Sequence, residues 1–397
     1  MREMGFMEKL LDGVEVEWTA INEVLNMRAG QHISASNIND YPDDEYQYPC
    51  FGGNGVRGFV KYNSHDGKYL LIGRQGALCG NVQRTDGKFY ATEHAVVVSS
   101  KRAINLDWAF HLLTMMNLNQ YASKSAQPGL AVGKIQSLKI PIPCPKNPKK
   151  SLEIQAEIVR ILDAMTAHTA ELTAELTARK KQYDYYRDKL LSFEEGEVEW
   201  RTFGEVANIQ RGASPRPIAK YITDDADGVP WIKIGDTSPG SKYVNGTAQK
   251  ITTTGAKMSR ILNKGDFIIS NSMSFGRPYI LNIKGAIHDG WASISGFSKT
   301  LNSDYLYHYL ASNAVQNYWV SKINSGSVSN LNADIIKTLP LPIPTISEQK
   351  QIATLLDKFD ALTSSLTEGL PREIELRQKQ YAYYRDKLLS FPAAQAE

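Results

Sequence analysis

The chain has 397 residues, with 45 basic and 42 acidic side chains and a formal net charge of +3. At about 150 residues per domain this length predicts two or three domains, and a composition of 42% hydrophobic and 22% charged residues excludes disorder throughout. No run of ~18 apolar residues occurs, so no membrane span is expected, and the first residues lack the pattern of a secretory signal. The three cysteines, Cys50, Cys79 and Cys144, form no C-x-x-C pair, which favours a reducing, cytoplasmic location.

The sequence repeats its own framework once. EVEW at 15–18 returns at 197–200, IPIP at 140–143 returns as LPIP at 341–344, and QYDYYRDKLLSF at 182–193 returns as QYAYYRDKLLSF at 380–391. The stretches between these segments, about 19–137 and 201–338, hardly resemble each other. Because KLLDGVEVEW at 9–18 also resembles KLLSFEEGEVEW at 189–200, the beginning of the chain is expected to lie near its last helix. The repeat thus predicts one framework that carries two unlike domains.

Within each half, strand-like segments come first and an amphipathic helix follows. In the first half the strands are expected at 56–63, 69–77 and 93–100, and the helix at 106–122. In the second half they are expected at 230–236, 266–272, 276–282 and 292–297, with the helix at 303–321. We therefore expect an α+β protein in four parts, namely a β-rich domain over 1–150, a central helix over 151–195, a second β-rich domain over 196–345 and a distal helix over 346–397.

The two long helices carry heptad seams that would bury each other as an antiparallel coiled coil. Ser151 and Ser347 are the expected starts, and the two copies align with an offset of 194 residues up to Leu172 and of 198 from Leu176, within the TAEL repeats at 169–176. Gly369 and Pro371 should kink or loosen the second helix where its four extra residues fall. The residues expected to contact the other helix or a partner protein are Leu172, Leu176, Tyr183, Tyr186, Leu366, Leu370, Tyr381 and Tyr384.

Catalytic motifs are weak or missing. GNGVRG at 53–58 matches a dinucleotide-binding pattern, but strand-like residues follow it where a helix is required. There is no phosphate-binding P-loop, and the seven histidines show no metal-ligand spacing. We therefore predict no catalytic residue and no metal site.

Loops rich in Arg, Lys, Gln, Asn, Ser and Gly remain as the candidate functional residues. Arg and Lys bridge the two acceptors of guanine, and Asn and Gln bridge adenine, so such loops are typical of a DNA-reading surface. Glycine beside each cluster would let backbone approach a ligand closely. The candidate DNA-binding residues are Arg28, Gln31, His32, Asn54, Arg57, Arg74 and Gln75 in the first half, and Arg211, Ser214, Arg216, Asn271, Ser272, Arg277, Lys322, Asn324 and Ser325 in the second.

These repeats resemble the DNA-specificity subunit of type I restriction–modification enzymes, in the subgroup with TAEL tetrads. The likeness spans nearly the whole chain and lies in the EVEW starts, the IPIP strands, the TAEL tetrads and the YYRDKLLSF helix ends. It implies two target-recognition domains that each read one half of a bipartite, asymmetric site in double-stranded DNA. It further implies a non-catalytic chain that binds no cofactor. The partners would be two adenine-N6 methyltransferase subunits and the restriction motor-nuclease subunits, which would carry S-adenosylmethionine, ATP and Mg²⁺.

Two other classes stay open on the sequence. One is a coiled-coil scaffold or adaptor with no DNA role, since a heptad helix by itself indicates only helix pairing. The other is a nucleotide-dependent enzyme with an unrecognised site, to which only GNGVRG points.

Overall fold

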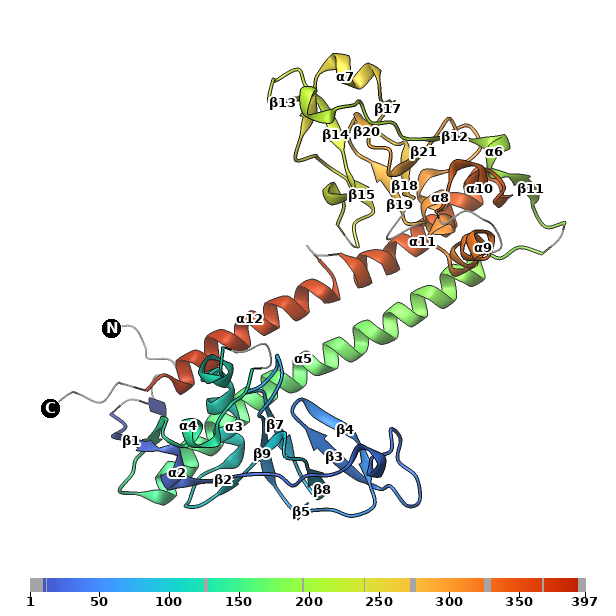
Figure 1. Ribbon diagram of the computed structural model, residues 1–397. Helices are drawn as coiled ribbons and strands as arrows, with labels where there is room; N and C mark the ends of the chain where they lie inside the picture. The colour runs from blue at the N-terminus through green and yellow to red at the C-terminus, as the bar shows by residue number, and fades with distance from the viewer. Residues whose placement is uncertain are drawn as a thin grey trace. The chain divides into compact units, whose positions relative to one another are not determined.

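The computed structural model describes residues 10–11, 13–124, 128–194, 196–238, 240–271, 276–324, 330–365 and 368–391 (Figure 1). Contacts divide the chain into two compact units. Unit 1 comprises Met1–Ala170 with Leu376–Glu397, and unit 2 comprises Glu171–Glu375. Each unit combines a β-rich globular domain with segments of long helix, so the predicted α+β class is confirmed. Among the described residues, no helix has the length and apolar character needed to cross a membrane.

The globular domain of unit 1 is built on three small sheets. Their strand orders are β1-β10, β2-β9-β6-β7 and β4-β3-β8-β5. The elements are β1 (Val16–Ala20), α2 (Ile21–Val24), β2 (Leu25–Ala29), η1 (Ala35–Asn37), β3 (Tyr48–Gly52), β4 (Gly55–Val60), β5 (His65–Asp66), β6 (Tyr69–Gly73), β7 (Val82–Thr85), β8 (Lys88–Ala91), β9 (Ala95–Ser100), α3 (Leu106–Met115), η2 (Leu118–Tyr121), α4 (Val132–Gln136) and β10 (Lys139–Pro143).

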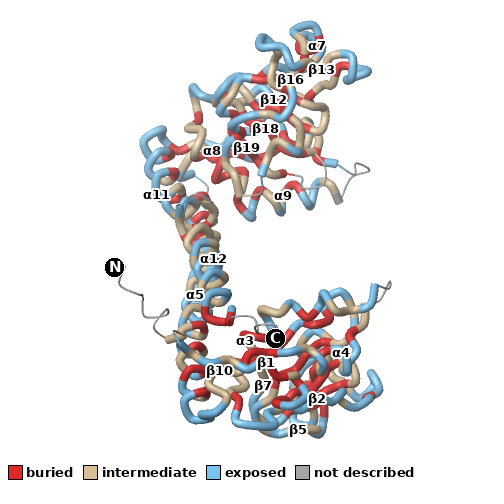
Figure 2. The backbone as a smooth tube through the Cα atoms, turned by 90° about the vertical axis from the view of Figure 1, so that its left-hand side faces the viewer, coloured by how far each residue is buried: buried red, intermediate tan, exposed pale blue. Residues whose placement is uncertain are grey.

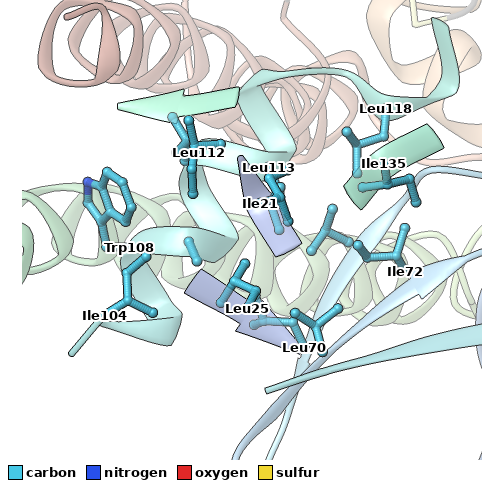
Figure 3. Packing of buried hydrophobic residues seen from close by; sticks show 14 of the residues in the cluster. Ile21, Leu25, Leu70, Ile72, Ile104, Trp108, Leu112, Leu113, Leu118 and Ile135 are labelled. Atoms are coloured by element: carbon cyan, nitrogen blue, oxygen red, sulfur yellow. The ribbon is translucent and has the colours of Figure 1, made fainter. Parts of the chain in front are cut away.

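Both faces of the central sheet in unit 1 are buried. Leu70 and Ile72 of β6 face the main core, which they share with Trp108 and Leu112 of α3 (Figure 3). Leu71, between them, belongs to a second cluster with Phe89 on the other face. This period of two is the geometry of a strand. It places the helices on one face of the sheet and the second four-stranded sheet against the other.

The globular domain of unit 2 follows the same plan, with five strands in each of its two larger sheets where unit 1 has four. Their strand orders are β11-β22, β12-β21-β18-β19-β15 and β13-β16-β14-β20-β17. The elements are β11 (Glu199–Thr202), α6 (Phe203–Val206), β12 (Asn208–Arg211), η3 (Ile218–Lys220), β13 (Ile222–Thr223), β14 (Val229–Ile232), η4 (Ile234–Asp236), β15 (Tyr243–Val244), β16 (Lys250–Ile251), α7 (Thr253–Lys257), β17 (Arg260–Leu262), β18 (Phe267–Ser270), β19 (Pro278–Leu281), β20 (Gly285–Ile287), β21 (Trp291–Ser295), α8 (Ser303–Leu310), α9 (Asn313–Asn324), α10 (Ala333–Lys337) and β22 (Pro340–Ile343). Alternation again separates Phe267 and Ile269 on one face of β18 from Ile268 on the other.

The repeated EVEW and Pro-rich segments pair with each other in both units. In unit 1, β1 pairs antiparallel with β10, with Val16 opposite Pro143. In unit 2, β11 pairs antiparallel with β22, with Glu199 opposite Ile343. A two-stranded ladder has only edges, so it tolerates proline, which has no N–H to donate. Each pair joins the two ends of one globular domain.

The long helices begin slightly earlier than their sequence signals suggest. Helix α5 (Pro148–Leu190) starts at a proline, with Asn147 Oδ1 accepting from the Lys150 N–H at 3.1 Å. Ser151 is therefore not its N-cap, because proline suits the first helical position and Asn147 supplies the capping oxygen. Helix α11 (Ile346–Ser364) starts after Thr345, which forms a capping box with Glu348, so the expected start at Ser347 is also wrong by two residues.

The second long helix is broken as predicted. Helix α11 ends at Ser364 and α12 (Leu370–Leu389) begins after Gly369, whose φ of +83° lies in the left-handed region that glycine adopts without strain. Pro371 then stands in the first turn of α12, where its missing N–H costs nothing. Leu366 lies outside the described residues.

Both amphipathic helices end earlier than expected. Helix α3 stops at Met115 because Asn117 takes a left-handed conformation, with φ of +46°. The segment expected as one helix at 303–321 forms two, α8 and α9, with Ala311 and Ser312 between them. The hydrophobic period of 3.6 residues continues through both junctions, so the sequence pattern does not reveal the turn at which each helix ends.

Within each unit the long-helix segments pack antiparallel. In unit 1, Leu388 and Leu389 of α12 share a core with Ile154 and Ile158 of α5. In unit 2, Tyr183 and Tyr186 of α5 stack on Phe359 of α11, with ring centroids 6.4 and 5.7 Å apart. Figure 2 shows buried residues concentrated inside the globular domains, with intermediate and exposed residues along α5 and α12.

Candidate nucleic-acid interface

The loop that follows β2 in unit 1 leads to a cluster of polar side chains. The Gly30 N–H donates to the Ala95 carbonyl at 2.9 Å, and a Cβ atom on Gly30 would overlap the Ala91 carbonyl oxygen. Only glycine therefore lets this loop lie against the turn between β8 and β9. Two residues on, His32 Nδ1 lies 3.0 Å from the Glu93 carboxylate in that turn, although the His32 side chain is 79% exposed.

The turn after β6 approaches the same acid from another side. Arg74 Nη1 donates to the Glu93 backbone carbonyl at 3.0 Å. An open hollow of about 500 Å³ lies next to Arg74, and its lining includes Asn54, Gln75 and His94. The structure thus brings together predicted residues from three separate loops, and we call His32, Arg74 and Glu93 the Glu93 cluster.

A corresponding cluster surrounds Asp289 in the turn between β20 and β21 of unit 2. The Ser214 hydroxyl donates to one carboxylate oxygen at 2.8 Å, and Arg216 Nη2 donates to the other at 3.1 Å. Arg211 Nε and Asn271 Nδ2 donate to the Asp289 backbone carbonyl at 3.3 and 3.5 Å. Four predicted residues therefore converge on one acid, and we call these five residues the Asp289 cluster.

Strand register fixes where the Glu93 cluster stands. Ala29 of β2 pairs with Val96 of β9. His32 lies three residues after Ala29, and Glu93 lies three residues before Val96. His32 and Glu93 therefore lie opposite each other just beyond the end of the β2–β9 ladder.

The Asp289 cluster has the same register. Arg211 of β12 pairs with Ala292 of β21. Ser214 lies three residues after Arg211, and Asp289 lies three residues before Ala292. Asn271, directly after β18, is the counterpart of Arg74, directly after β6. Two domains that hardly resemble each other in sequence therefore carry an acid and its partners at equivalent positions.

Both acids are favoured in their ionised form. Burial alone would raise the pKa of Asp289, but the Ser214 hydroxyl and the neighbouring His288 hold that pKa below its ordinary value. Burial likewise opposes ionisation of Glu93, yet its hydrogen bond to His32 and the nearby His94 lower the pKa of Glu93. Hydrogen bonds to a carboxylate favour the charged form, so each cluster contains an ionised carboxylate at neutral pH.

The remaining predicted DNA-binding residues take other positions. Arg28 on β2 and Arg57 on β4 are exposed, and Gln31 forms a single β-bridge with Thr92. Arg277 and Lys322 lie over the rings of their own neighbours Tyr279 and Tyr318, at 5.6 and 5.3 Å. Ser272 and Ser325 lie outside the described residues, as does the side chain of Asn324 at the end of α9.

The two acids at the centres of the clusters were not among the predicted residues. Donors meet bases and phosphates, and ionised acids are not donors. A signal was nonetheless present, because each half has a histidine and an acid side by side just before a strand, Glu93-His94 and His288-Asp289. The GNGVRG segment lies in the hairpin between β3 and β4, so no helix follows it as a dinucleotide site requires. The described residues contain no group of three His, Cys, Asp or Glu that would hold a metal ion.

A second duplicated contact ties each globular domain to the long helices. In unit 1, His111 of α3 is fully buried, with Nε2 2.8 Å from Asp163 of α5 and Nδ1 3.2 Å from the Tyr381 hydroxyl of α12. Arg84 donates to the same Asp163 oxygen at 2.9 Å and pairs with Asp107 at 3.0 Å. Since a carboxylate only accepts, Nε2 carries the proton and the tyrosine hydroxyl donates to Nδ1.

Unit 2 repeats this arrangement residue for residue. His308 of α8 is fully buried, with Nε2 2.8 Å from Asp357 of α11 and Nδ1 2.9 Å from the Tyr183 hydroxyl of α5. Lys242 takes the place of Arg84 and lies 2.6 Å from both Asp357 and Asp304. The aspartates are 194 residues apart and the tyrosines 198 apart, so the structure reproduces the offsets predicted from the repeat.

The other described residues predicted for helix or partner contact are partly or fully covered. Leu172, Leu176 and Tyr384 are half-buried and Leu370 is buried. Two tyrosines outside that predicted set, Tyr185 and Tyr383, are the most exposed aromatic side chains of these helices, at 60% and 61%. Each meets the next tyrosine edge to face, with centroids 5.3 Å apart for Tyr185–Tyr186 and 5.2 Å for Tyr383–Tyr384.

The architecture of paired unlike domains on repeated helices matches a known family. The family model described as the type I restriction modification DNA specificity domain matches residues 14–179 and 195–376. The chain belongs to this family of type I specificity subunits and is a non-catalytic, DNA-recognising subunit of a restriction–modification system.

Two relatives cover nearly the whole chain. It is 35% identical to the EcoR124I/EcoR124II specificity subunit of Escherichia coli, over 99% of this chain and 98% of that protein. It is 34% identical to a putative specificity subunit of Haemophilus influenzae, over 97% and 98% of the two chains. A third relative, the EcoprrI specificity subunit of Escherichia coli, is 62% identical over 162 residues, which is 41% of this chain and 39% of that protein.

Solved structures agree on the fold. A specificity subunit from M. genitalium has a TM-score of 0.61 at 16% identity and covers 98% of this chain and all of its own. A chain from a structure on the complex assembly and conformational transition of the type I system has a TM-score of 0.62 at 14% identity, with 94% and 97% of the two chains covered.

Proposed function

We propose that this chain reads a bipartite, asymmetric DNA site, one half with each globular domain, and positions adenine-N6 methyltransferase and restriction subunits on it. The observation that carries the proposal is the pair of clusters at equivalent positions in two domains of unlike sequence. A common strand framework with different exposed side chains is what two different half-sites require. DNA reading by this chain is what the family implies.

The side chains of the clusters suit base edges in the major groove. Arg216 keeps further guanidinium N–H groups beyond the one that meets Asp289, and these match the acceptors of guanine. Asn54 and Gln75 beside the hollow of unit 1 offer the donor and acceptor pair that matches adenine. Exposed cations such as Arg28, Arg57 and Lys322 serve phosphate contacts, which position a protein without reading sequence.

The methyltransferase subunits would dock on the duplicated helix ends. The tyrosine pairs Tyr185–Tyr186 and Tyr383–Tyr384, exposed mainly through Tyr185 and Tyr383, present a similar surface twice. Exposed tyrosine is enriched at protein interfaces, because its ring is apolar and its hydroxyl forms hydrogen bonds. Two copies of one partner fit two copies of one surface. S-adenosylmethionine, ATP and Mg²⁺ belong to those partners.

Co-expression with an adenine methyltransferase of a type I system tests this function. The purified complex is incubated with a library of randomised DNA duplexes and S-adenosylmethionine, and the methylated duplexes are sequenced. The expected result is a site of two unlike specified parts with an unspecified gap between them. A complex that forms but selects no sequence would instead favour the scaffold.

A single substitution links that site to a named cluster. Arg216→Ala should relax one base position in one half-site and weaken binding by ~1–3 kcal/mol if the side chain reads a base. Arg201→Ala, an exposed arginine of β11 in the same unit, serves as the matched control. A loss of affinity that is equal for all sequences would assign Arg216 to a phosphate.

A further inference from the structure

An acid at the centre of a DNA-reading cluster needs a physical reason. DNA presents a negative charge about every 1.7 Å of its axis, so an ionised carboxylate on this face is repelled by the backbone. Both domains nevertheless have one, at the same point of the strand ladder. The carboxylate must therefore serve a purpose that two unlike domains share.

The shared purpose is visible in what each carboxylate holds. Glu93 binds the ring of His32, and Asp289 binds the guanidinium of Arg216. These two side chains are 79% and 81% exposed, whereas the acids themselves are only 34% and 24% exposed. Each acid thus lies beneath an exposed side chain and fixes its orientation.

Some polar atoms near the two acids lack partners. Among the described residues, eight buried side-chain N or O atoms have no hydrogen-bond partner, and four of them belong to Arg74, Glu93, His94 and Asn271. Such atoms are uncommon in folded proteins. Hydrogen-bonding capacity beside both acids is therefore left unused by the chain itself.

We propose that Glu93 and Asp289 are equivalent positioning residues for sequence recognition, each orienting the side chain that reads one base of its own half-site. This inference rests on the proposed function of the chain. The exposed side chain that the acid orients differs between the domains, His32 in one and Arg216 in the other. The acid, and the glycine that precedes the loop with this side chain, have equivalent positions in both domains. The two domains therefore share a framework and differ in the side chain that would contact the base.

The chemistry differs for the two readers. In the Glu93 cluster the carboxylate accepts from Nδ1 of His32, so that in the neutral form of the ring Nε2 is an acceptor for the exocyclic amine of adenine or cytosine. In the Asp289 cluster the carboxylate holds one edge of the Arg216 fork and leaves its other donors for guanine.

The test is the recognised sequence of variants in the complex with the methyltransferase. Asp289→Asn keeps the shape of the side chain and removes its charge, and it should reduce the preference at one base of one half-site by about tenfold. Glu93→Gln should do the same at one base of the other half-site. Asp40→Asn and Asp227→Asn, exposed acids of units 1 and 2, are the matched controls and should leave the site unchanged.

A double-mutant cycle separates positioning from mere stabilisation. If Asp289 acts through Arg216, then Asp289→Asn adds nothing to the loss that Arg216→Ala causes alone, whereas independent residues would add. Asp289→Glu, which keeps the charge, should restore part of the preference. Ser214→Ala removes the second hydrogen bond of the carboxylate and should weaken the same base position.

The outcomes distinguish this inference from the proposed function. A wild-type complex that selects no sequence overturns the proposed function. A wild-type complex that selects a bipartite site, with Asp289→Asn and Glu93→Gln variants that select the same site at uniformly lower affinity, overturns only the positioning role. Changes in both half-sites from a single substitution would overturn it as well.

Discussion

At the scale of single residues, the two buried histidines connect globular domain to helix. His111 and His308 each satisfy both ring nitrogens, one on an aspartate of one long helix and one on a tyrosine of another segment. Inside a protein such a network is stabilising only while every member is satisfied. The partners of the two histidines could not be predicted from the sequence, because a periodic helix pattern does not show which residue a side chain will contact.

Replacing either histidine should destabilise only its own unit. His111→Leu leaves the Asp163 carboxylate and the Tyr381 hydroxyl without their partner, which costs about 1–3 kcal/mol. His308→Leu should do the same in unit 2. Urea unfolding followed by hydrogen exchange of each unit measures the loss, and His168→Leu, at an exposed helix position, is the control. Equal losses in both units from one substitution would contradict this assignment.

Stability of unit 1 should depend on pH through His111. Burial lowers the pKa of His111, and Arg84 adds to this, although the hydrogen bond to Asp163 opposes it. As the pH falls past ~6.5, the ordinary pKa of histidine, His111 therefore binds a proton in the unfolded chain before it does so in the folded chain. The stabilising contribution is complete above that pH and is lost as the pH falls further through the folded-state pKa.

Urea midpoints measured for unit 1 at pH 7.5 and pH 5.5 check this dependence. The wild-type protein should lose more stability at the lower pH than His111→Gln, which no longer titrates. The same pH dependence in both proteins would assign the effect to other groups.

The exposed tyrosines should set how many methyltransferase subunits bind. Tyr185→Ser and Tyr383→Ser each remove one copy of the duplicated surface, so each single variant should bind one subunit and the double variant none. Native mass spectrometry of the reconstituted complex gives the count. Tyr41→Ser, at an exposed tyrosine of the first globular domain, is the control. Single variants that still bind two subunits would place the interface elsewhere.

At the scale of elements, the helices show what periodicity can and cannot predict. The offset of 194 and then 198 residues was visible in the repeat, and the duplicated histidine contacts reproduce it. Gly369 and Pro371 indicated the break between α11 and α12. The helix starts were missed by a few residues, because a serine and an asparagine compete as caps and only the backbone geometry decides between them.

Adding a third TAEL after Leu176 should change the gap in the DNA site. Four residues extend a helix by ~6 Å and turn it by a net ~40°, while one base pair advances ~3.4 Å and twists by ~35°. The unread gap should therefore grow by about one base pair, with both half-sites unchanged. Methylome sequencing measures this, and a four-residue insertion in an exposed loop of either domain is the control. Altered half-sites would disprove the helix as spacer.

At the scale of the whole molecule, the sequence predicted the framework far better than the reading surface. Repeated segments such as EVEW and the Pro-rich strands are detectable because they are copies, and they pair in both units. Glu93 and Asp289 are equivalent only through strand register, which depends on contacts between residues far apart in the chain. Strand register cannot be read from a single sequence, so the two acids were not predicted to be functional residues although residues near them were.

Exchange of one globular domain should change one half of the recognised site. Replacing residues 19–137 with the corresponding segment of another specificity subunit keeps Val16–Trp18 of β1 and all of β10, the pair that closes the domain. One half-site should change while the other half and the gap stay the same. Sequencing of methylated DNA checks this, and the reciprocal exchange of residues 201–338 is the matched experiment. A change in both halves would contradict independent reading.

Unit 1 is formed by two separate segments of the chain, and this affects when it can fold during synthesis. Its core joins Ile154 and Ile158 to Leu388 and Leu389, more than two hundred residues later, whereas unit 2 is one contiguous stretch, Glu171–Glu375. During synthesis, unit 2 has all of its residues before unit 1 receives its last helix. The face of unit 1 that α12 covers must therefore stay exposed until the end of translation. A nascent chain stalled before residue 376 should bind chaperones through that face and release them when α12 emerges.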